Sequence, residues 1–195
     1  MESSSLIQFV KENAFGVLVS DLNGTLEATH LPLLFSEDHK FLIGHFAKPN
    51  PLKDSLSKEV LCIFSGPHCY ISPSWYESNR SVPTWNYTAV HIKGILTYIE
   101  DPSEIQLCLK TLVDTFESDQ SSYKLNDVDN DYFIGLQKGI VPFRIQITKI
   151  EGKAKLSQNH SLERRKLVIE NLKRMPGENE KGIANLMEQS LDQNS

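Results

Sequence analysis

Short stretches of β-branched and aromatic residues, separated by turn residues, constrain the fold of this chain more than any other feature. The stretches are Phe15–Val19, Leu26–Phe35, Lys40–Phe46, Glu59–Phe64, Tyr70–Ser72, Tyr87–Ile99 and Val141–Leu156. Asp21-Leu-Asn-Gly24 predicts a hairpin turn, and Ser36-Glu-Asp-His39 predicts a second turn. Ser65-Gly66-Pro67 predicts a bend. Short strands at this spacing are typical of an antiparallel β-barrel.

Helical patterns flank and interrupt the strands. We expect helices over residues 4–13, capped by Ser4 or Ser5, and over 102–116, where Asp101-Pro102 is a start signal. Residues 118–131 predict an acidic loop, and 131–138 a short helix. Two further helices, 161–174 and 179–191, close the chain. The simplest architecture is one β-barrel with a helical excursion and a helical C-terminus.

The 195 residues suit one domain with a small appendage. No apolar run approaches the roughly 18 residues that a membrane-spanning helix needs. The N-terminus lacks the basic and apolar regions of a secretory signal, so we expect a cytoplasmic protein with no membrane partner. The cysteines, Cys62, Cys69 and Cys108, have no metal-site spacing, and we expect reduced, mostly buried thiols.

Charge is strongly segregated along the chain, although the net charge is only −5. Residues 100–131 hold nine acids and two bases, whereas residues 132–175 hold ten bases and three acids. The basic segment makes DNA a candidate partner. The alternative is that adjacent acidic and basic surfaces neutralise each other within the fold or across a dimer.

A Pro-rich corner is the first candidate site. Ala28–Leu33 and Gly44–Pro51 are expected on adjacent strands, and Lys48, Asn50 and Lys53 cluster at the corner. Ammonium and amide donors on a turn restrained by proline suit a phosphate monoester. The alternative is a bend with solvated lysines.

An aromatic cluster is the second candidate site. Both tryptophans and three of the six tyrosines lie within Gly66–Tyr76 and Val82–Tyr87, among Pro, Ser and Asn. Aromatic faces beside hydroxyl and amide groups suit a planar heteroaromatic ligand or a dimer interface. The alternative is that the cluster packs one end of the barrel.

Other chemistries find little support. His30, His45, His68 and His91 lack metal-ligand spacing, so we expect no metal site. The chain has no nucleophile-elbow, Walker or dinucleotide-binding motif. In the basic helix 161–174 we expect Leu162, Val168 or Ile169, and Leu172 to face the core. The basic side chains, including Arg164 and Arg165, should stay solvated, and a helix-turn-helix reading is disfavoured because the connection is long.

Six motifs together resemble the PaiB family of FMN-binding negative transcriptional regulators. They are FGVLVS (15–20), ATHLPL (28–33), GHFAKPNP (44–51), GPHCYISPSWY (66–76), VPTWNY (82–87) and EGKAKLSQN (151–159). The resemblance implies an antiparallel split barrel of FMN-binding type (α+β, mainly β), related to pyridoxamine-phosphate oxidases and flavin reductases. It also implies a homodimer with FMN at the subunit interface. On this reading, residues 1–159 form the split-barrel domain, including the excursion 102–138, and 160–195 form a helical extension packed on it.

The resemblance also implies site residues. The strand of Thr29, His30 and Leu31 should lie along the flavin. The phosphate should be held by His45, Ala47, Lys48 and Asn50. Trp85, Asn86 and Tyr87, with Trp75, should form the side of the pocket that faces the dimer.

Two departures from the family pattern affect this reading. Family members often carry a Tyr-x-Pro element before the first helix, which this chain lacks, and this puts cofactor affinity in question. They also tend to have Arg where this chain has His160.

Three functions remain open from the sequence. The first is an FMN-binding regulator. The second is a flavin-dependent oxidoreductase, of the pyridoxamine-phosphate-oxidase or flavin-reductase type. The third is a haem-handling split barrel. No residue stands out as a dedicated proton donor, so the sequence names no catalytic residue and leaves open whether the chain is an enzyme.

Overall fold

The structure, a computed structural model, describes residues 3–77, 81–118, 120–123, 135 and 137–192. The helices are α1 (Ser3–Glu12), α2 (Pro102–Phe116), α4 (Leu162–Lys173) and α5 (Glu178–Asp192), with short 3₁₀ turns η1 (Pro51–Ser55) and η2 (Pro73–Trp75). The strands are β1 (Phe15–Leu22), β2 (Thr25–Pro32), β3 (Leu34–Phe35), β4 (Phe41–Ala47), β5 (Glu59–Ile71), β6 (Thr84–Tyr98) and β7 (Ile140–Lys155).

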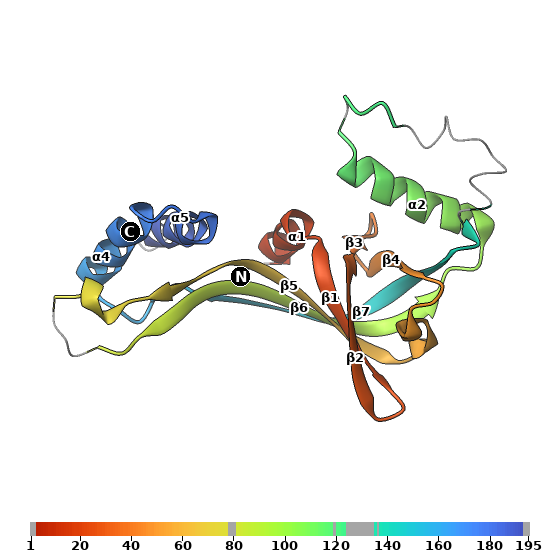
Figure 1. The fold of residues 1–195 in the computed structure, drawn as a ribbon, viewed down its shortest axis with the longest axis horizontal. Coiled ribbons are helices and arrows are strands. Elements are labelled where there is room, and N and C mark those ends of the chain that lie inside the picture. The colour runs from red at the N-terminus through yellow and green to blue at the C-terminus, as the bar shows by residue number, and fades with distance from the viewer. Residues whose placement is uncertain (1–2, 78–80, 119, 124–134, 136, 193–195) are drawn as a thin grey trace. The chain divides into compact units, whose positions relative to one another are not determined.

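The described strands form one sheet of the split-barrel type, which is not closed. Its order is β2-β1-β5-β6-β7-β4-β3 (Figure 1). β2 and β4 lie far apart in this order, yet they contact each other, and η1 contacts both β1 and β2. The sheet therefore curls until strands near its two edges meet, as a split barrel requires.

The predicted first hairpin is confirmed. Asn23 and Gly24 have φ values of 57° and 85°, and β1 pairs with β2 from Leu22↔Thr25 onward. Two adjacent residues with positive φ make the turn whose twist matches the flanking strands. The second strand is shorter than expected: it ends at Pro32, Leu33 N donates to Ala14 O, and Leu34 starts β3, which pairs with β4.

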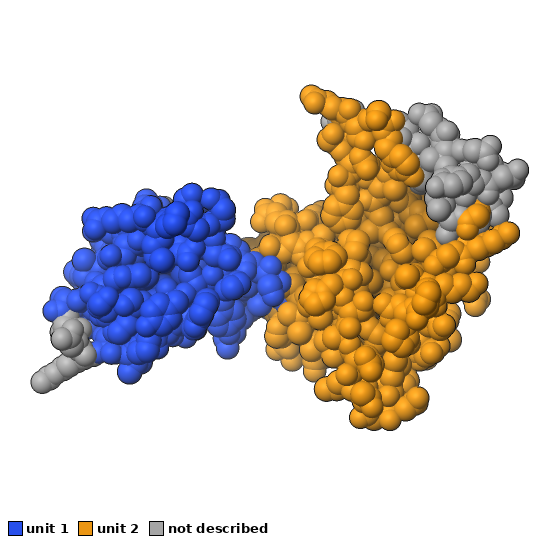
Figure 2. Space-filling model, in the orientation of Figure 1, with its two compact units in different colours: residues 1, 65–90, 152–195 blue, residues 2–64, 91–151 orange. Residues whose placement is uncertain are grey.

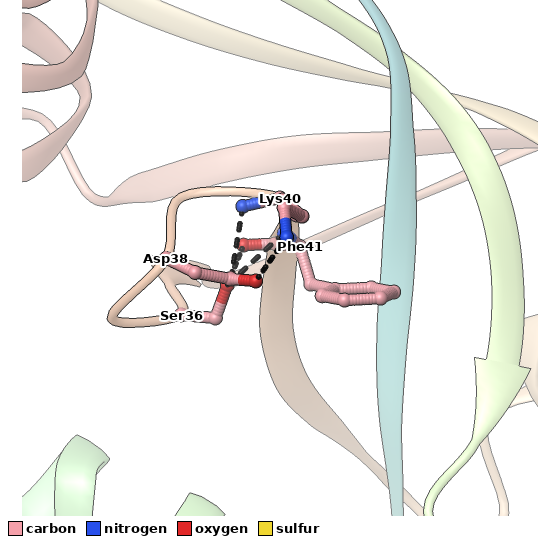
Figure 3. Close-up of polar contacts among 4 residues, drawn as sticks. All are labelled: Ser36, Asp38, Lys40 and Phe41. Atoms are coloured by element: carbon pink, nitrogen blue, oxygen red, sulfur yellow. Dashed lines mark hydrogen bonds and ion pairs between the residues drawn. The ribbon is translucent and has the colours of Figure 1, made fainter.

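A compact turn fixes the start of β4 (Figure 3). Ser36 Oγ donates to Asp38 Oδ1 at 2.7 Å and accepts from Phe41 N at 3.1 Å. Asp38 Oδ1 also accepts from Lys40 N at 3.2 Å. These bonds lower the pKa of the Asp38 carboxyl. The turn sets the register of the strand that ends at the Pro-rich corner.

The predicted bend at Ser65-Gly66-Pro67 is wrong, because β5 runs without interruption from Glu59 to Ile71. Proline fixes φ at a value that an extended strand tolerates, and it removes only one backbone N–H donor from the strand. The Pro67 carbonyl still accepts from Thr88 Oγ1 at 3.4 Å. Pro67 therefore acts as a strand residue here.

The chain divides into two compact units, coloured separately in Figure 2. Unit 2 comprises residues 2–64 and 91–151; unit 1 is formed mainly by 65–90 and 152–195. These units are defined by contacts within the fold and do not test the predicted domain boundary at residue 159. That boundary therefore stays a prediction.

The core of unit 2 is made by alternate strand residues. Leu18, Leu42 and Phe143 are fully buried, and the rings of Phe46 and Phe143 stack with centroids 4.3 Å apart. Helix α2 begins where predicted, with Asp101 accepting from Ser103 N and Glu104 N. It contacts β4, and its buried residues Cys108 and Leu112 join a second apolar cluster.

In unit 1, α4 and α5 lie side by side (Figure 1) and share an apolar cluster with strand residues. Val168, Ile169 and Leu172 are buried, as expected. Two expectations for α4 are wrong. Leu162 is 48% exposed because it opens the helix, and Arg165 is buried and donates from Nη2 to Ser190 Oγ at 2.5 Å.

Some expectations cannot be compared with the structure. Most of the predicted short helix 131–138 and much of the acidic loop 118–131 fall outside the described residues. In the part that is described, no helix is long and apolar enough to cross a membrane.

Candidate functional site

The Pro-rich corner after β4 is held by backbone bonds on both sides. Lys48 N donates to Gly139 O at 2.8 Å, and Asn50 N donates to Ala47 O at 2.8 Å. The Asn50 side chain caps η1 by accepting from Leu52 N at 2.9 Å, with Pro51 in the first position of the turn. Because capping and proline both restrict the backbone, the corner is a preorganised platform.

The structure brings Thr29 and Asn50 together, although the prediction that their strands are adjacent is wrong: β2 and β4 are not neighbours in the sheet and meet because the sheet curls. Asn50 Nδ2 donates to Thr29 Oγ1 at 3.1 Å. Leu31, two residues along β2, lies on the same strand face and is only 5% exposed. His30 lies on the opposite face, where its ring centroid is 6.0 Å from that of the exposed Phe15.

Two lysines, Lys48 and Lys53, flank Asn50 in the sequence of the corner. Lys48 is exposed and has no side-chain bond among the described contacts, and Lys53 Nζ donates to the Lys48 carbonyl at 3.2 Å. Asn50 keeps a second amide N–H, and the Thr29 hydroxyl keeps its proton. The corner therefore combines positive charge with unused donors, which is the chemistry of a phosphate subsite.

His45, near the end of β4, carries an unsatisfied group. Its Nδ1 atom is buried and has no hydrogen-bond partner among the described residues. It stands opposite Pro142 of β7, which has no N–H to offer. Burial lowers the pKa of the imidazole, so the neutral form is favoured. Ala47, two residues further along β4, is exposed.

Three residues predicted on the side of the pocket that faces the dimer, Trp85, Asn86 and Tyr87, lie on β6 in unit 1. Their exposure alternates along the strand. Trp85 is 52% exposed and lies near the rings of His68 and Tyr70, at centroid distances of 5.7 and 6.4 Å. Tyr87 is half-buried, with Lys153 Nζ 6.0 Å from its ring centroid. Trp85 and Tyr87 thus share one strand face with a basic neighbour.

Asn86 lies on the opposite face and is fully buried. Its amide donates to Ser157 Oγ at 3.0 Å and to Met187 Sδ at 3.4 Å, and Ser157 Oγ lies 3.1 Å from Asn86 Oδ1. In this structure the amide joins β6 to the turn after β7 and to α5. A direct contact between Asn86 and a cofactor stays a prediction.

Sequence reasoning missed Ser157. Its φ is 61°, a conformation that serine rarely adopts, and the residue is 4% exposed. The signal was its position in a polar run, Ser157-Gln-Asn-His160, directly after a strand, where a tight turn is needed.

The cysteines are buried as expected, and burial raises the pKa of Cys62 and Cys69 to about 12 and of Cys108 to about 11. Within the described residues, no group of three His, Cys, Asp or Glu side chains could hold a metal ion.

Comparisons with known proteins agree with this geometry. A family model described as "Putative FMN-binding domain" matches residues 1–149. The chain is 40% identical over 188 residues to the "Protease synthase and sporulation protein PAI 2" of Bacillus subtilis (strain 168), covering 94% of this chain and 90% of that protein. It is 28% identical over 229 residues to the "Uncharacterized protein AN0679" of Emericella nidulans, covering 94% and 91%.

Solved structures share the fold at low sequence identity. The flavocytochrome Anf3 from Azotobacter vinelandii aligns with a TM-score of 0.61 at 14% identity, covering 78% of this chain and 67% of that chain. The FAD and heme binding protein from Mycobacterium smegmatis aligns with a TM-score of 0.58 at 9% identity, covering 84% and 76%. At these identities the likeness is one of fold.

Proposed function

Since the chain belongs to the family described as "Putative FMN-binding domain" and, within it, to the PaiB family, we propose that it is a flavin-binding regulator whose Pro-rich corner holds the phosphate of FMN. FMN is the cofactor that the family assignment gives the chain. The observation that carries the corner assignment is the bond between Asn50 and Thr29 beside the exposed Lys48. All three residues lie within the matched segment.

The corner fits a phosphate group in charge and in donors. Lys48 supplies a point charge, while Asn50 and Thr29 supply donors that the fold has not used up. His45 adds a buried ring nitrogen that has no hydrogen-bond partner in the described part of the chain. When bound, FMN supplies hydride and electron transfer, and the protein's part is to bind and orient it.

The regulatory role and the homodimer rest on relatedness and surface chemistry. The 40% identity extends over nearly the whole of a relative named for protease synthesis and sporulation. Trp85, with His68 and Tyr70, forms an exposed aromatic group of the kind enriched at interfaces. We propose that Trp85 and Tyr87 face the second subunit. We also propose that the protein acts in the cytoplasm.

Two alternative functions, and DNA as a further partner, can be distinguished by experiment. A flavin-dependent oxidoreductase would consume NADH or NADPH with FMN present, whereas a regulator would not. A haem-handling barrel would show a haem absorbance band on reconstitution. Direct DNA binding would show a steep fall in affinity with rising salt.

Equilibrium titration of FMN against purified protein, followed by flavin fluorescence, tests the corner assignment. Lys48→Ala should weaken binding at least about tenfold, the size expected for a charge-assisted hydrogen bond. Lys40→Ala is the matched control: it removes an equal charge from the exposed turn at the other end of β4. Equal affinities for the two variants would contradict the corner assignment.

A further inference from the structure

Unit 1 contains a pocket that the flavin assignment does not use. It has a volume of about 700 Å³ and lies at the start of β6, the end of β7 and the first turn of α4. Seven of its eight described lining residues have polar side chains. The volume falls within the usual range for small-molecule sites, but the lining is far more polar than in most of them.

Two basic side chains are held in place at this pocket. Lys155 Nζ donates to Thr84 Oγ1 at 2.5 Å. Arg164 Nη1 donates to Ser81 Oγ at 3.3 Å, and Glu77 Oε1 accepts from Arg164 Nε at 2.7 Å and lies 2.6 Å from Nη2. Only 23% of the Arg164 side chain is exposed. Glu77 balances one of the two positive charges, so Lys155 leaves a surplus, and both side chains keep unused N–H donors.

Ser157 and His160, which also line the pocket, are held firmly. Asn86 holds the Ser157 hydroxyl in the fully buried network described above. The His160 ring packs against Tyr76, with centroids 5.3 Å apart, and the Arg164 guanidinium lies 5.1 Å from the same ring. Tyr76, which both groups contact, is itself only 9% exposed. The polar groups are thus ordered before any ligand binds, which lowers the cost of binding.

We propose that this pocket binds a small oxyanion, a phosphate or carboxylate group, on Lys155 and Arg164, separately from the flavin corner. Arginine and lysine held beside hydroxyl donors are the groups that recognise such anions. Five of the lining residues, including both cations, lie beyond the segment matched by the FMN-binding family model. The corner residues lie in unit 2, whereas every lining residue of the pocket lies in unit 1.

NMR titration of the ¹⁵N-labelled full chain tests this proposal. Sodium phosphate and sodium acetate are titrated separately, with sodium chloride keeping the ionic strength constant. The backbone amides of Ser157 and His160 should shift and saturate with phosphate, with acetate or with both, which tells which anion the pocket takes. Lys155→Met should weaken that binding about tenfold or more. Lys166→Met is the matched control, since it removes an exposed charge from α4 outside this pocket.

Three results would overturn the proposal: shifts that do not saturate with either anion, equal effects of Lys155→Met and Lys166→Met, or displacement of the anion by FMN. The flavin assignment is tested separately by Lys48→Ala. That variant should lose FMN affinity and keep the anion-dependent shifts at Ser157. If the chain bound no FMN at all, the anion titration would still decide this proposal.

Discussion

At the scale of single residues, the buried amide of Asn86 has consequences for stability. It bonds to Ser157 and Met187 in a region that excludes water. Removing one member of such a network leaves the other polar group buried without a partner, which costs more than the bond itself contributes.

Asn86→Ala should therefore lower the free energy of unfolding by roughly 1–3 kcal/mol, the usual cost of an unsatisfied buried group. Urea denaturation measures this change. Asn159→Ala, at an exposed position two residues after Ser157, is the matched control and should stay near the wild-type value. If both variants unfolded at the same urea concentration as the wild type, the network would not contribute to the stability of the fold.

His45 leads to a prediction about pH. Burial lowers the pKa of its imidazole in the folded state, so the unfolded chain binds the proton more readily. Stability should therefore fall as the pH drops through the unfolded value of about 6.5. His45→Gln should make this fall shallower in urea melts between roughly pH 7.5 and 5.5. His30→Gln, which alters an exposed residue of β2 and keeps His45, is the control. A slope unchanged by His45→Gln would rule out this role.

At the scale of elements, the sequence predicted correctly the turn and the helix start that depend only on the backbone conformation of neighbouring residues. The Asp21–Gly24 turn requires residues that accept positive φ, and the start of α2 requires a capping carboxylate beside proline. Both requirements can be read from adjacent residues.

Features that depend on residues far away in the sequence, such as the extent of a strand or the burial of a side chain, were predicted less well. Ser65-Gly66-Pro67 carries turn residues, yet neighbouring strands keep β5 extended through it. Arg165 lies in a basic stretch that is typical of a solvated helix face. In the structure, however, α5 packs over it, and Ser190 accepts a hydrogen bond from its guanidinium. In the candidate site, the polar character of Asn86 was visible in the sequence, whereas its inward orientation depends on Ser157, 71 residues later.

The close approach of β6 and β7 gives an element-scale prediction. A Cβ atom at Gly94 would lie 2.4 Å from Gln146 O and 2.5 Å from Ile145 Cγ2. Since one of these atoms is backbone, relief requires the two strands to separate. Gly94→Ala should cost about 1–3 kcal/mol or more in thermal or urea unfolding.

Gly24 provides the comparison. A Cβ atom there meets no described atom within 4 Å, but φ is +85°. Gly24→Ala should cost only about 1–2 kcal/mol from backbone conformation, and Gly24→Asn less, because asparagine tolerates that region. If Gly94→Ala were no more costly than Gly24→Asn, β6 and β7 would have to be further apart than the structure has them.

At the scale of the whole molecule, the basic segment of the sequence is divided between the two compact units. Lys138, Arg144 and Lys149 belong to unit 2, whereas the bases from Lys153 to Arg174 belong to unit 1. Arg144 pairs with Glu104 of α2 at 3.2 Å, so part of the acidic segment neutralises part of the basic one. The argument for DNA from sequence charge is weaker for this reason.

The division into units also separates two binding chemistries. The corner proposed to hold the flavin phosphate belongs to unit 2, and the pocket proposed to bind an oxyanion belongs to unit 1. The family match covers the first and stops before most of the second.

The most direct test of the central claim is the ratio of the dissociation constants of riboflavin and FMN for the purified protein. Riboflavin lacks the phosphate that the corner is proposed to hold. We expect FMN to bind at least about tenfold more tightly than riboflavin, and Lys48→Ala to abolish most of that preference. Equal affinity for the two flavins, or no binding of FMN at high micromolar concentration, would contradict the account.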